Sequence, residues 1–139
     1  AALVLSNQLG HDRVWMCPAM MVSPLRTTVQ SVQTSRTNDP TSVVSYWLWR
    51  FDRMDEPIAL DNFWGKTPEH ALRDLREANN PNAGQPESLT EVELAVDPYF
   101  PGTVPSLPAE LKGRSVHRRG RNALMLDGHA AFLRDPRVR

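Results

Sequence analysis

Apolar side chains gather in a few short stretches of this chain, and the clearest early stretch is residues 42–51. It concentrates β-branched and aromatic residues, which favours a β-strand. Because side chains alternate between the two faces of a strand, Trp47 and Trp49 are expected to share one face. One face would join the core. If the other face lies exposed beside Trp64, we expect it to contact another subunit or, alternatively, to bind a carbohydrate.

The pattern predicts a helix over residues 68–79. Thr67 can cap it, Pro68 suits its first position, and Asn79 with the following Asn-Pro pair ends it. Four residues form an apolar stripe at helical spacing, namely Ala71, Leu72, Leu75 and Ala78. The charged residues between them are expected in solvent: Arg73, Asp74, Arg76 and Glu77.

Shorter signals surround these two elements. The sequence predicts the last turns of a helix over residues 1–9, a brief strand over 14–17 ended by Pro18, and a strand over 91–96. Residues 98–108 contain four prolines and are expected to form an extended connection.

The C-terminal region carries a hairpin signal. Two five-residue runs, 122–126 and 129–133, flank Asp127-Gly128, whose residue types tolerate the positive φ angles of a two-residue turn. In that register Leu126 faces His129. Because apolar residues occur on both sides of the hairpin, both faces are expected to be covered. Together these elements predict an α+β fold with an antiparallel sheet, a C-terminal hairpin and long Pro-rich loops.

Composition fits one globular domain over residues 1–139, with 40% hydrophobic and 23% charged residues. The formal net charge of zero conceals an asymmetry. Residues 1–111 hold 8 basic and 14 acidic side chains, whereas residues 112–139 hold 8 basic and 2 acidic ones. We expect the basic tail, with Arg118, Arg119 and Arg121, to meet the acidic remainder or an acidic neighbouring subunit. Nucleic acid is the less favoured partner because no aromatic residue is interleaved with these arginines.

Cys17 is the single cysteine, so the chain can form no internal disulfide. We expect it to be a small buried residue and not a nucleophile. The sequence shows no long apolar run and no signal-peptide pattern. A start at Ala1 without methionine leads us to expect a processed or truncated product that lacks an N-terminal segment.

His117 stands ten residues before Asp127, which gives the pattern His, nine residues, Asp-Gly. This pattern resembles the prepilin-type processing-associated H-X9-DG domain of bacterial pilin-like proteins. Upstream, Cys17-Pro18 is similar to the Cys-Pro element of that family, and Ser45-Tyr46 to its Ser-Tyr strand. The residues in matching C-terminal places are His117, Gly120, Asn122, Asp127, Gly128 and His129.

The resemblance implies the head domain of a type IV pilin or of a type II secretion pseudopilin. Such heads are built on an antiparallel sheet and carried by a long N-terminal hydrophobic helix. That helix and its processing site are absent from this sequence. The motif residues are then expected to be structural: they would shape the turn and hold the loop against the hairpin.

Metal binding is the alternative for the polar residues. His117, Asp127 and His129 carry groups that ligate metals or transfer protons, so they form an alternative metal or catalytic cluster. Some related pseudopilins bind calcium in a C-terminal loop, and this chain offers acidic candidates for such an ion. These candidates are Asp52, Asp55, Glu56, Asp61 and Asp97.

The functional prediction is a structural, non-enzymatic subunit without a cofactor. It would associate with pilin-like subunits in a pilus or pseudopilus of the bacterial cell envelope, periplasm or cell exterior, and would reach the membrane only through the missing helix. The alternatives are a metal-dependent enzyme that uses His117, Asp127 and His129, and a carbohydrate- or ligand-binding module.

Overall fold

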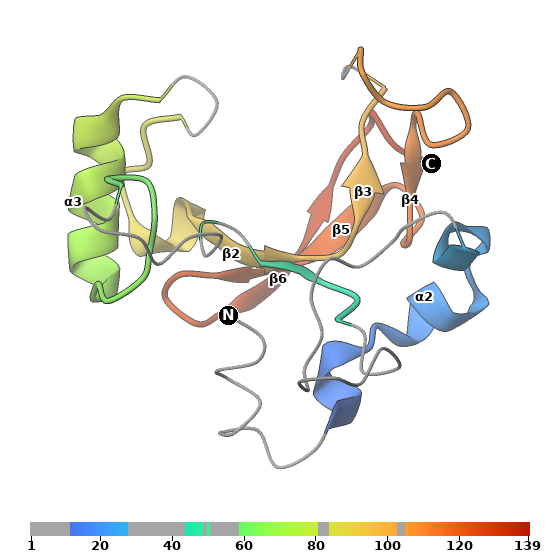
Figure 1. The fold of residues 1–139 in the computed structure, drawn as a ribbon, viewed down its shortest axis with the longest axis horizontal. Coiled ribbons are helices and arrows are strands. Elements are labelled where there is room, and N and C mark those ends of the chain that lie inside the picture. The colour runs from blue at the N-terminus through green and yellow to red at the C-terminus, as the bar shows by residue number, and fades with distance from the viewer. Residues whose placement is uncertain (1–11, 28–43, 49, 51–58, 81–83, 103–104) are drawn as a thin grey trace. The chain divides into compact units, whose positions relative to one another are not determined.

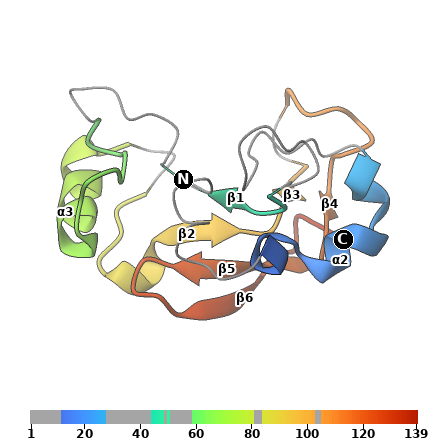
Figure 2. The same cartoon turned by 60° about the horizontal axis from the view of Figure 1, so that its bottom comes forward.

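The computed structural model describes residues 12–27, 44–48, 50, 59–80, 84–102 and 105–139. The fold is α+β, with helices and antiparallel sheets (Figures 1 and 2). Its α-helices are α2 (Pro18–Val22) and α3 (Pro68–Ala78), and its short 3-10 helices are Asp12–Trp15, Pro24–Thr27 and Leu89–Glu91. Its strands are β1 (Trp47–Leu48), β2 (Glu93–Val96), β3 (Tyr99–Phe100), β4 (Arg114–Ser115), β5 (Gly120–Met125) and β6 (Ala130–Arg134).

The strands form two sheets. One has four strands in the order β1-β2-β5-β6, and the other is the antiparallel pair β3-β4. The contacts divide the chain, which we expected to be one domain, into two compact units. The first unit contains residues 1–47, 96–122 and 132–139, and the second contains 48–95 and 123–131.

The core of the first unit gathers Cys17, Met20, Leu25, Phe100 and Leu111. Trp47 packs against this core and meets the Phe100 ring edge-on, with 5.3 Å between the ring centroids. Trp47 is therefore a packing residue of this unit. The face of the strand that carries Trp47 is thus the face that joins a core, and Trp47 is not an exposed interface residue of the isolated chain.

The segment around Cys17 is helical, so the predicted strand over residues 14–17 is wrong. A 3-10 helix occupies Asp12–Trp15, and Pro18 begins α2 instead of ending a strand. Proline is favourable in the first turn of a helix because the backbone N–H that it lacks would have no partner there. Cys17 consequently lies at the N-cap of α2.

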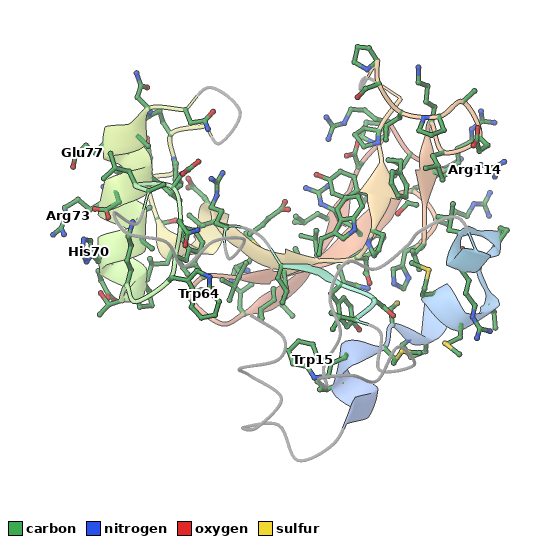
Figure 3. The ribbon with its side chains drawn as sticks, viewed as in Figure 1. Trp15, Trp64, His70, Arg73, Glu77 and Arg114 are labelled. Carbon is green, nitrogen blue, oxygen red and sulfur yellow. The ribbon has the colours of Figure 1, made fainter. Side chains whose placement is uncertain are left out.

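The core of the second unit is built on α3, where the sequence-based prediction is confirmed. Thr67 Oγ1 accepts a hydrogen bond from the His70 backbone N–H at 3.3 Å, and Asn79 ends the helix with a φ of 46°. Ala71 and Leu75 are buried and pack with Phe63 and Val92. Figure 3 shows Arg73 and Glu77 pointing away from the helix, as expected of solvated side chains.

Asp74 is the exception on this helix, because it is buried and not solvated. Its Oδ2 lies 2.8 Å from Lys66 Nζ and 3.2 Å from His70 Nε2. The hydrogen bond and the positive charge of Lys66 hold the pKa of Asp74 below its ordinary value. The apolar stripe therefore borders a buried ion pair, which sequence spacing alone did not indicate.

Two predicted extended segments differ in detail from the structure. The strand predicted over residues 91–96 begins at Glu93, because a 3-10 helix ends at Glu91. Within the connection predicted over 98–108, Tyr99–Phe100 forms β3 and pairs with β4. Of the strand predicted over 42–51, the described part is a strand at Trp47–Leu48, whereas Trp49 lies outside the described residues, as does the helix predicted over 1–9.

The C-terminal hairpin is present, but its predicted two-residue turn is wrong. The Met125 N–H donates to His129 O and the Gly128 N–H donates to Met125 O, both at 2.9 Å. Met125 and not Leu126 therefore pairs with His129. Gly128 has a φ of 91°, so the loop is a turn followed by a left-handed glycine, which adds one residue.

The two faces of the hairpin differ in burial. Ala123 and Met125 are buried, as one face of a strand in a core should be. Leu124 is 38% exposed and Phe132 is 49% exposed. Within the isolated chain one face is therefore covered and the other is partly exposed, and coverage of the second face by a partner stays a prediction.

Replacing Leu75 by Ala tests the core of the second unit. Leu75 is 2% exposed, so the change removes buried methyl groups and leaves a cavity. We expect the free energy of unfolding to fall by about 2 to 5 kcal/mol in denaturant titration. The control is Glu77→Ala on the solvent face of the same helix, with an expected change of roughly 0.5 kcal/mol or less. Equal effects of the two variants would contradict this assignment of the core.

Candidate functional site

The loop between β4 and β5 brings His117 back beside the start of β5. His117 and Gly120 form an antiparallel bridge, and Ser115 Oγ donates to Gly120 O at 2.6 Å. Arg119, within the loop, has a φ of 61°, which reverses the chain over very few residues. The imidazole of His117 is thereby held at one place by backbone contacts on both sides of the loop.

Gly120 is required by close packing. A Cβ atom at this position would lie 2.7 Å from Phe132 Cζ and would also collide with the backbone oxygen of Leu133. The Phe132 ring in turn meets the His117 imidazole edge-on, with centroids 6.5 Å apart. The small residue in the motif thus permits the ring contact that borders His117.

Asp97 is the centre of the site. It follows β2 directly and is completely buried. Its Oδ2 accepts the Asn122 backbone N–H at 2.9 Å and the Asn122 side-chain amide at 2.8 Å, and lies 3.0 Å from His117 Nε2. The Asp97 N–H donates back to Asn122 O at 3.0 Å. Two residues of the predicted motif, His117 and Asn122, therefore converge on one buried carboxylate.

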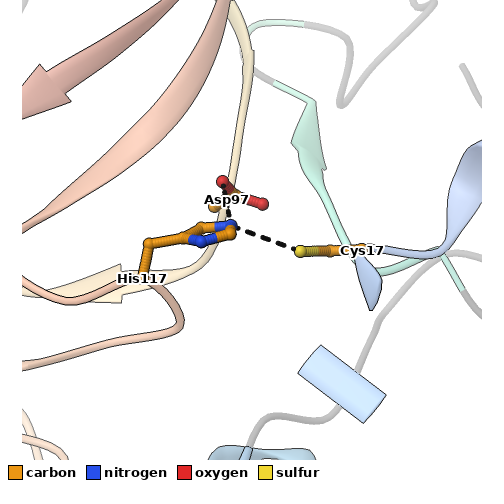
Figure 4. A group of neighbouring side chains, drawn as sticks. All are labelled: Cys17, Asp97 and His117. Carbon is orange, nitrogen blue, oxygen red and sulfur yellow. Dashed lines mark hydrogen bonds and ion pairs between the residues drawn. The ribbon is translucent and has the colours of Figure 1, made fainter. Parts of the chain in front are cut away.

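Cys17 completes the group from the N-cap of α2. Its Sγ lies 3.5 Å from His117 Nε2, and Figure 4 shows contacts from the imidazole to both the thiol and the Asp97 carboxylate. Burial raises the pKa of the Cys17 thiol, and the negative charge of Asp97 raises it further. A buried and protonated thiol is a poor nucleophile, so this arrangement does not favour thiol catalysis. Burial of Cys17 was predicted from the sequence, whereas its contact with His117 was not.

The predicted cluster of His117, Asp127 and His129 is divided between the two units, with His117 in the first and Asp127 and His129 in the second. Among the described residues, one group of three potential metal ligands (His, Cys, Asp or Glu side chains) has its ligand atoms within 4.8 Å of one another. It consists of Cys17, Asp97 and His117. Asp127 and His129 instead pair with each other at the turn, where Asp127 Oδ1 accepts the His129 N–H at 3.1 Å and lies 2.6 Å from His129 Nδ1. The hydrogen bonds and charge of His129 lower the pKa of Asp127. This pair shapes the turn.

Two of the calcium candidates, Asp61 and Asp97, lie among the described residues, and each has its own partners. Asp61 Oδ2 lies 3.4 Å from Arg50 Nη1, in a salt bridge. Asp52, Asp55 and Glu56 lie outside the described residues. Asp97 has cysteine, histidine and asparagine as neighbours, whereas calcium favours a set of oxygen ligands. Its surroundings therefore suit a different class of ion.

The basic candidates separate into two groups. Arg121 stacks over the Tyr99 ring at 4.2 Å and reaches the Asp135 carboxylate at 3.4 Å, so it has a packing role. Arg118 and Arg119 are exposed. They line an open cavity of about 390 Å³ together with Phe132 and Arg134, and we call these four residues the basic groove. Of the remaining interface candidates, Trp64 is half-buried and its backbone N–H donates to Asn62 Oδ1 at 3.0 Å.

Sequence reasoning named Cys17, Pro18, His117, Gly120 and Asn122, but it did not place Asp97 with them. The available signal was the position of Asp97, directly after a predicted strand and before Pro98. A carboxylate at the end of a buried strand requires hydrogen-bond donors from another segment. The family-like motif supplies those donors.

Comparison of the chain with protein-family models, curated proteins and solved structures found no significant match. Among the helices that the structure describes, none combines the length and the apolar character needed to cross a membrane.

Tyr46 provides a test of the electrostatics around the site. Burial raises the pKa of Tyr46 to about 12, from an ordinary value of 10.0, and the nearby Cys17 and Asp97 add to the shift. Above pH 10 the unfolded chain loses this proton while the folded chain retains it, so stability falls as the pH rises from 10 towards 12. We expect the free energy of unfolding of Tyr46→Phe to fall less between pH 10 and pH 12 than that of the wild type, as measured by denaturant titration.

The same tyrosine can be followed directly by absorbance. The chain has two tyrosines, so native Tyr46→Phe reports Tyr99 alone and the difference from the wild type reports Tyr46. A tyrosinate signal from Tyr46 that appears near pH 10 in the folded protein would contradict the buried environment.

Proposed function

We propose that this chain is the head domain of a pilin-like structural subunit. The observation that carries the proposal is that the residues of the H-X9-DG motif contact neighbouring parts of their own fold. His117 and Asn122 hold the Asp97 carboxylate, and the Asp127–His129 pair shapes the turn. A motif whose residues organise the hairpin supports a structural role more than a catalytic one.

The charge distribution supports association between subunits. Positive charge collects in residues 112–139, and Arg118, Arg119 and Arg134 line the basic groove. No salt bridge joins these three side chains to an acidic group within the described part of the chain. The remainder of the chain carries more acidic than basic side chains. We therefore propose that the basic groove binds an acidic surface of a neighbouring subunit, because opposite electrostatic potentials favour and orient such contacts.

The alternatives receive less support from the side chains. Thiol chemistry would require an accessible thiolate, and Cys17 is buried. The metal-dependent enzyme was based on His117, Asp127 and His129, and these residues have separate partners. An aromatic sugar platform would require exposed rings, whereas Trp47 is partly buried and packs against the core of the first unit. The proposed location is the bacterial cell envelope or an extracellular filament, reached through an N-terminal hydrophobic helix of the complete protein.

A charge-reversal variant tests the proposed subunit contact. In the complete natural protein in its own cells, we expect Arg118→Glu with Arg119→Glu to lower the yield of filaments or cross-linked oligomers roughly tenfold or more. The loss follows from like charges facing each other across the contact. Electron microscopy and chemical cross-linking of envelope fractions measure it.

The matched control carries the same change of charge at exposed arginines outside the groove, Arg26→Glu with Arg114→Glu. Both double variants should unfold at nearly the same temperature as the wild type. Equal assembly of the two variants would overturn the assignment of the groove. A complete protein that forms no filament and cross-links to no pilin-like subunit would overturn the proposed function itself.

A further inference from the structure

We propose that Cys17, Asp97 and His117 form a binding site for one divalent transition-metal ion of the zinc type. The inference is independent of filament assembly, because it depends on the geometry of these three side chains alone. They come from the N-cap of α2, the end of β2 and the loop before β5, and Figure 4 shows them facing one another.

The spacing of the ligand atoms suits a metal of this size. Zinc bonds of normal length in tetrahedral geometry place neighbouring nitrogen, oxygen and sulfur ligands about 3.3 to 3.6 Å apart. Here Cys17 Sγ lies 3.5 Å and Asp97 Oδ2 lies 3.0 Å from His117 Nε2, and all three ligand atoms lie within 4.8 Å of one another. The two distances from His117 Nε2 therefore lie within a few tenths of an ångström of the separations expected around one ion.

A second observation concerns the other oxygen of the same carboxylate. Asp97 is fully buried, and its Oδ1 has no hydrogen-bond partner among the described residues. A buried carboxylate oxygen without a donor is unfavourable, because burial removes its water and nothing replaces it. A cation beside the carboxylate would offset that cost.

The polar neighbours of His117 Nε2 also make conflicting hydrogen-bonding demands on it. It has three polar neighbours, namely Cys17 Sγ, Asp97 Oδ2 and, at 3.0 Å, Asn122 Nδ2. If Nε2 carries a proton, it can donate to Asp97. The N–H groups of Nε2 and of the Asn122 amide then face each other as two donors, which is unfavourable. With the proton on Nδ1 instead, the Nε2 lone pair is available to a metal that also binds the thiolate and the carboxylate.

The type of ligand selects the type of metal. A thiolate and an imidazole suit zinc and neighbouring transition metals, whereas calcium and magnesium require mainly oxygen. Binding breaks the Cys17 S–H bond, forms a sulfur–metal bond and releases the proton to the solvent. Asn122 keeps its hydrogen bond to Asp97 Oδ2 and orients that ligand from outside the coordination sphere. Because the His117 side chain is 27% exposed, water can reach a fourth position.

Cobalt is the probe for the test. The untagged, folded chain of residues 1–139 is freed of metal by a chelator and titrated with Co²⁺ and then with Zn²⁺. Its metal content is measured after dialysis. We expect one ion per chain, with a sulfur-to-cobalt charge-transfer band that disappears when Zn²⁺ displaces Co²⁺. Because Cys17 is the single cysteine, that band reports this residue alone.

Three variants and one control complete the test. Cys17→Ser should abolish the charge-transfer band, and His117→Ala and Asp97→Asn should each weaken Zn²⁺ binding at least about tenfold. The control, His129→Ala, removes an exposed histidine that also pairs with an aspartate, and should bind as the wild type does. Wild type without the band, or binding that Cys17→Ser and His117→Ala leave unchanged, would overturn the site. If a variant does not fold, the presence or absence of the sulfur-to-cobalt charge-transfer band in the wild type tests the site by itself.

Discussion

The arrangement of the first unit depends on one buried carboxylate. Asp97 has no solvent contact, so the donors that it receives must come from other segments of the chain. Asn122 supplies two of them, and the backbone of Asp97 returns a bond to Asn122. His117 adds a third contact and brings Cys17 with it. One side chain thereby joins β2, β5 and the beginning of α2.

This constraint explains why the motif residues are specific. Asn122 is suited to its place because its side chain and its backbone N–H reach the same oxygen. Gly120 leaves room for the Phe132 ring, which borders His117. The hydrogen-bonded base of the hairpin suits a structural head, and Asp97 Oδ1, which has no partner among the described residues, suits a bound cation. The two proposals stand or fall separately.

Local signals in the sequence predicted the elements that depend on neighbouring residues. The helix at Pro68–Ala78 followed from Thr67, Pro68 and Asn79, because caps and the first turn act within a few residues. The hairpin followed from Asp127-Gly128, although its loop is one residue longer than predicted. Burial of Asp74 beside Lys66 was missed, because helical spacing does not show which charges a neighbouring segment will cover.

The sequence by itself determined the α+β class, the helix, the hairpin and the identity of the motif residues around His117 and Asn122. Only the tertiary structure decided that Asp97 and Cys17 join them, and that His129 stays with Asp127. Cys17 and His117 are 100 positions apart in the chain. Contacts between such distant residues depend on how whole elements pack, and neither residue type nor short-range spacing carries that information.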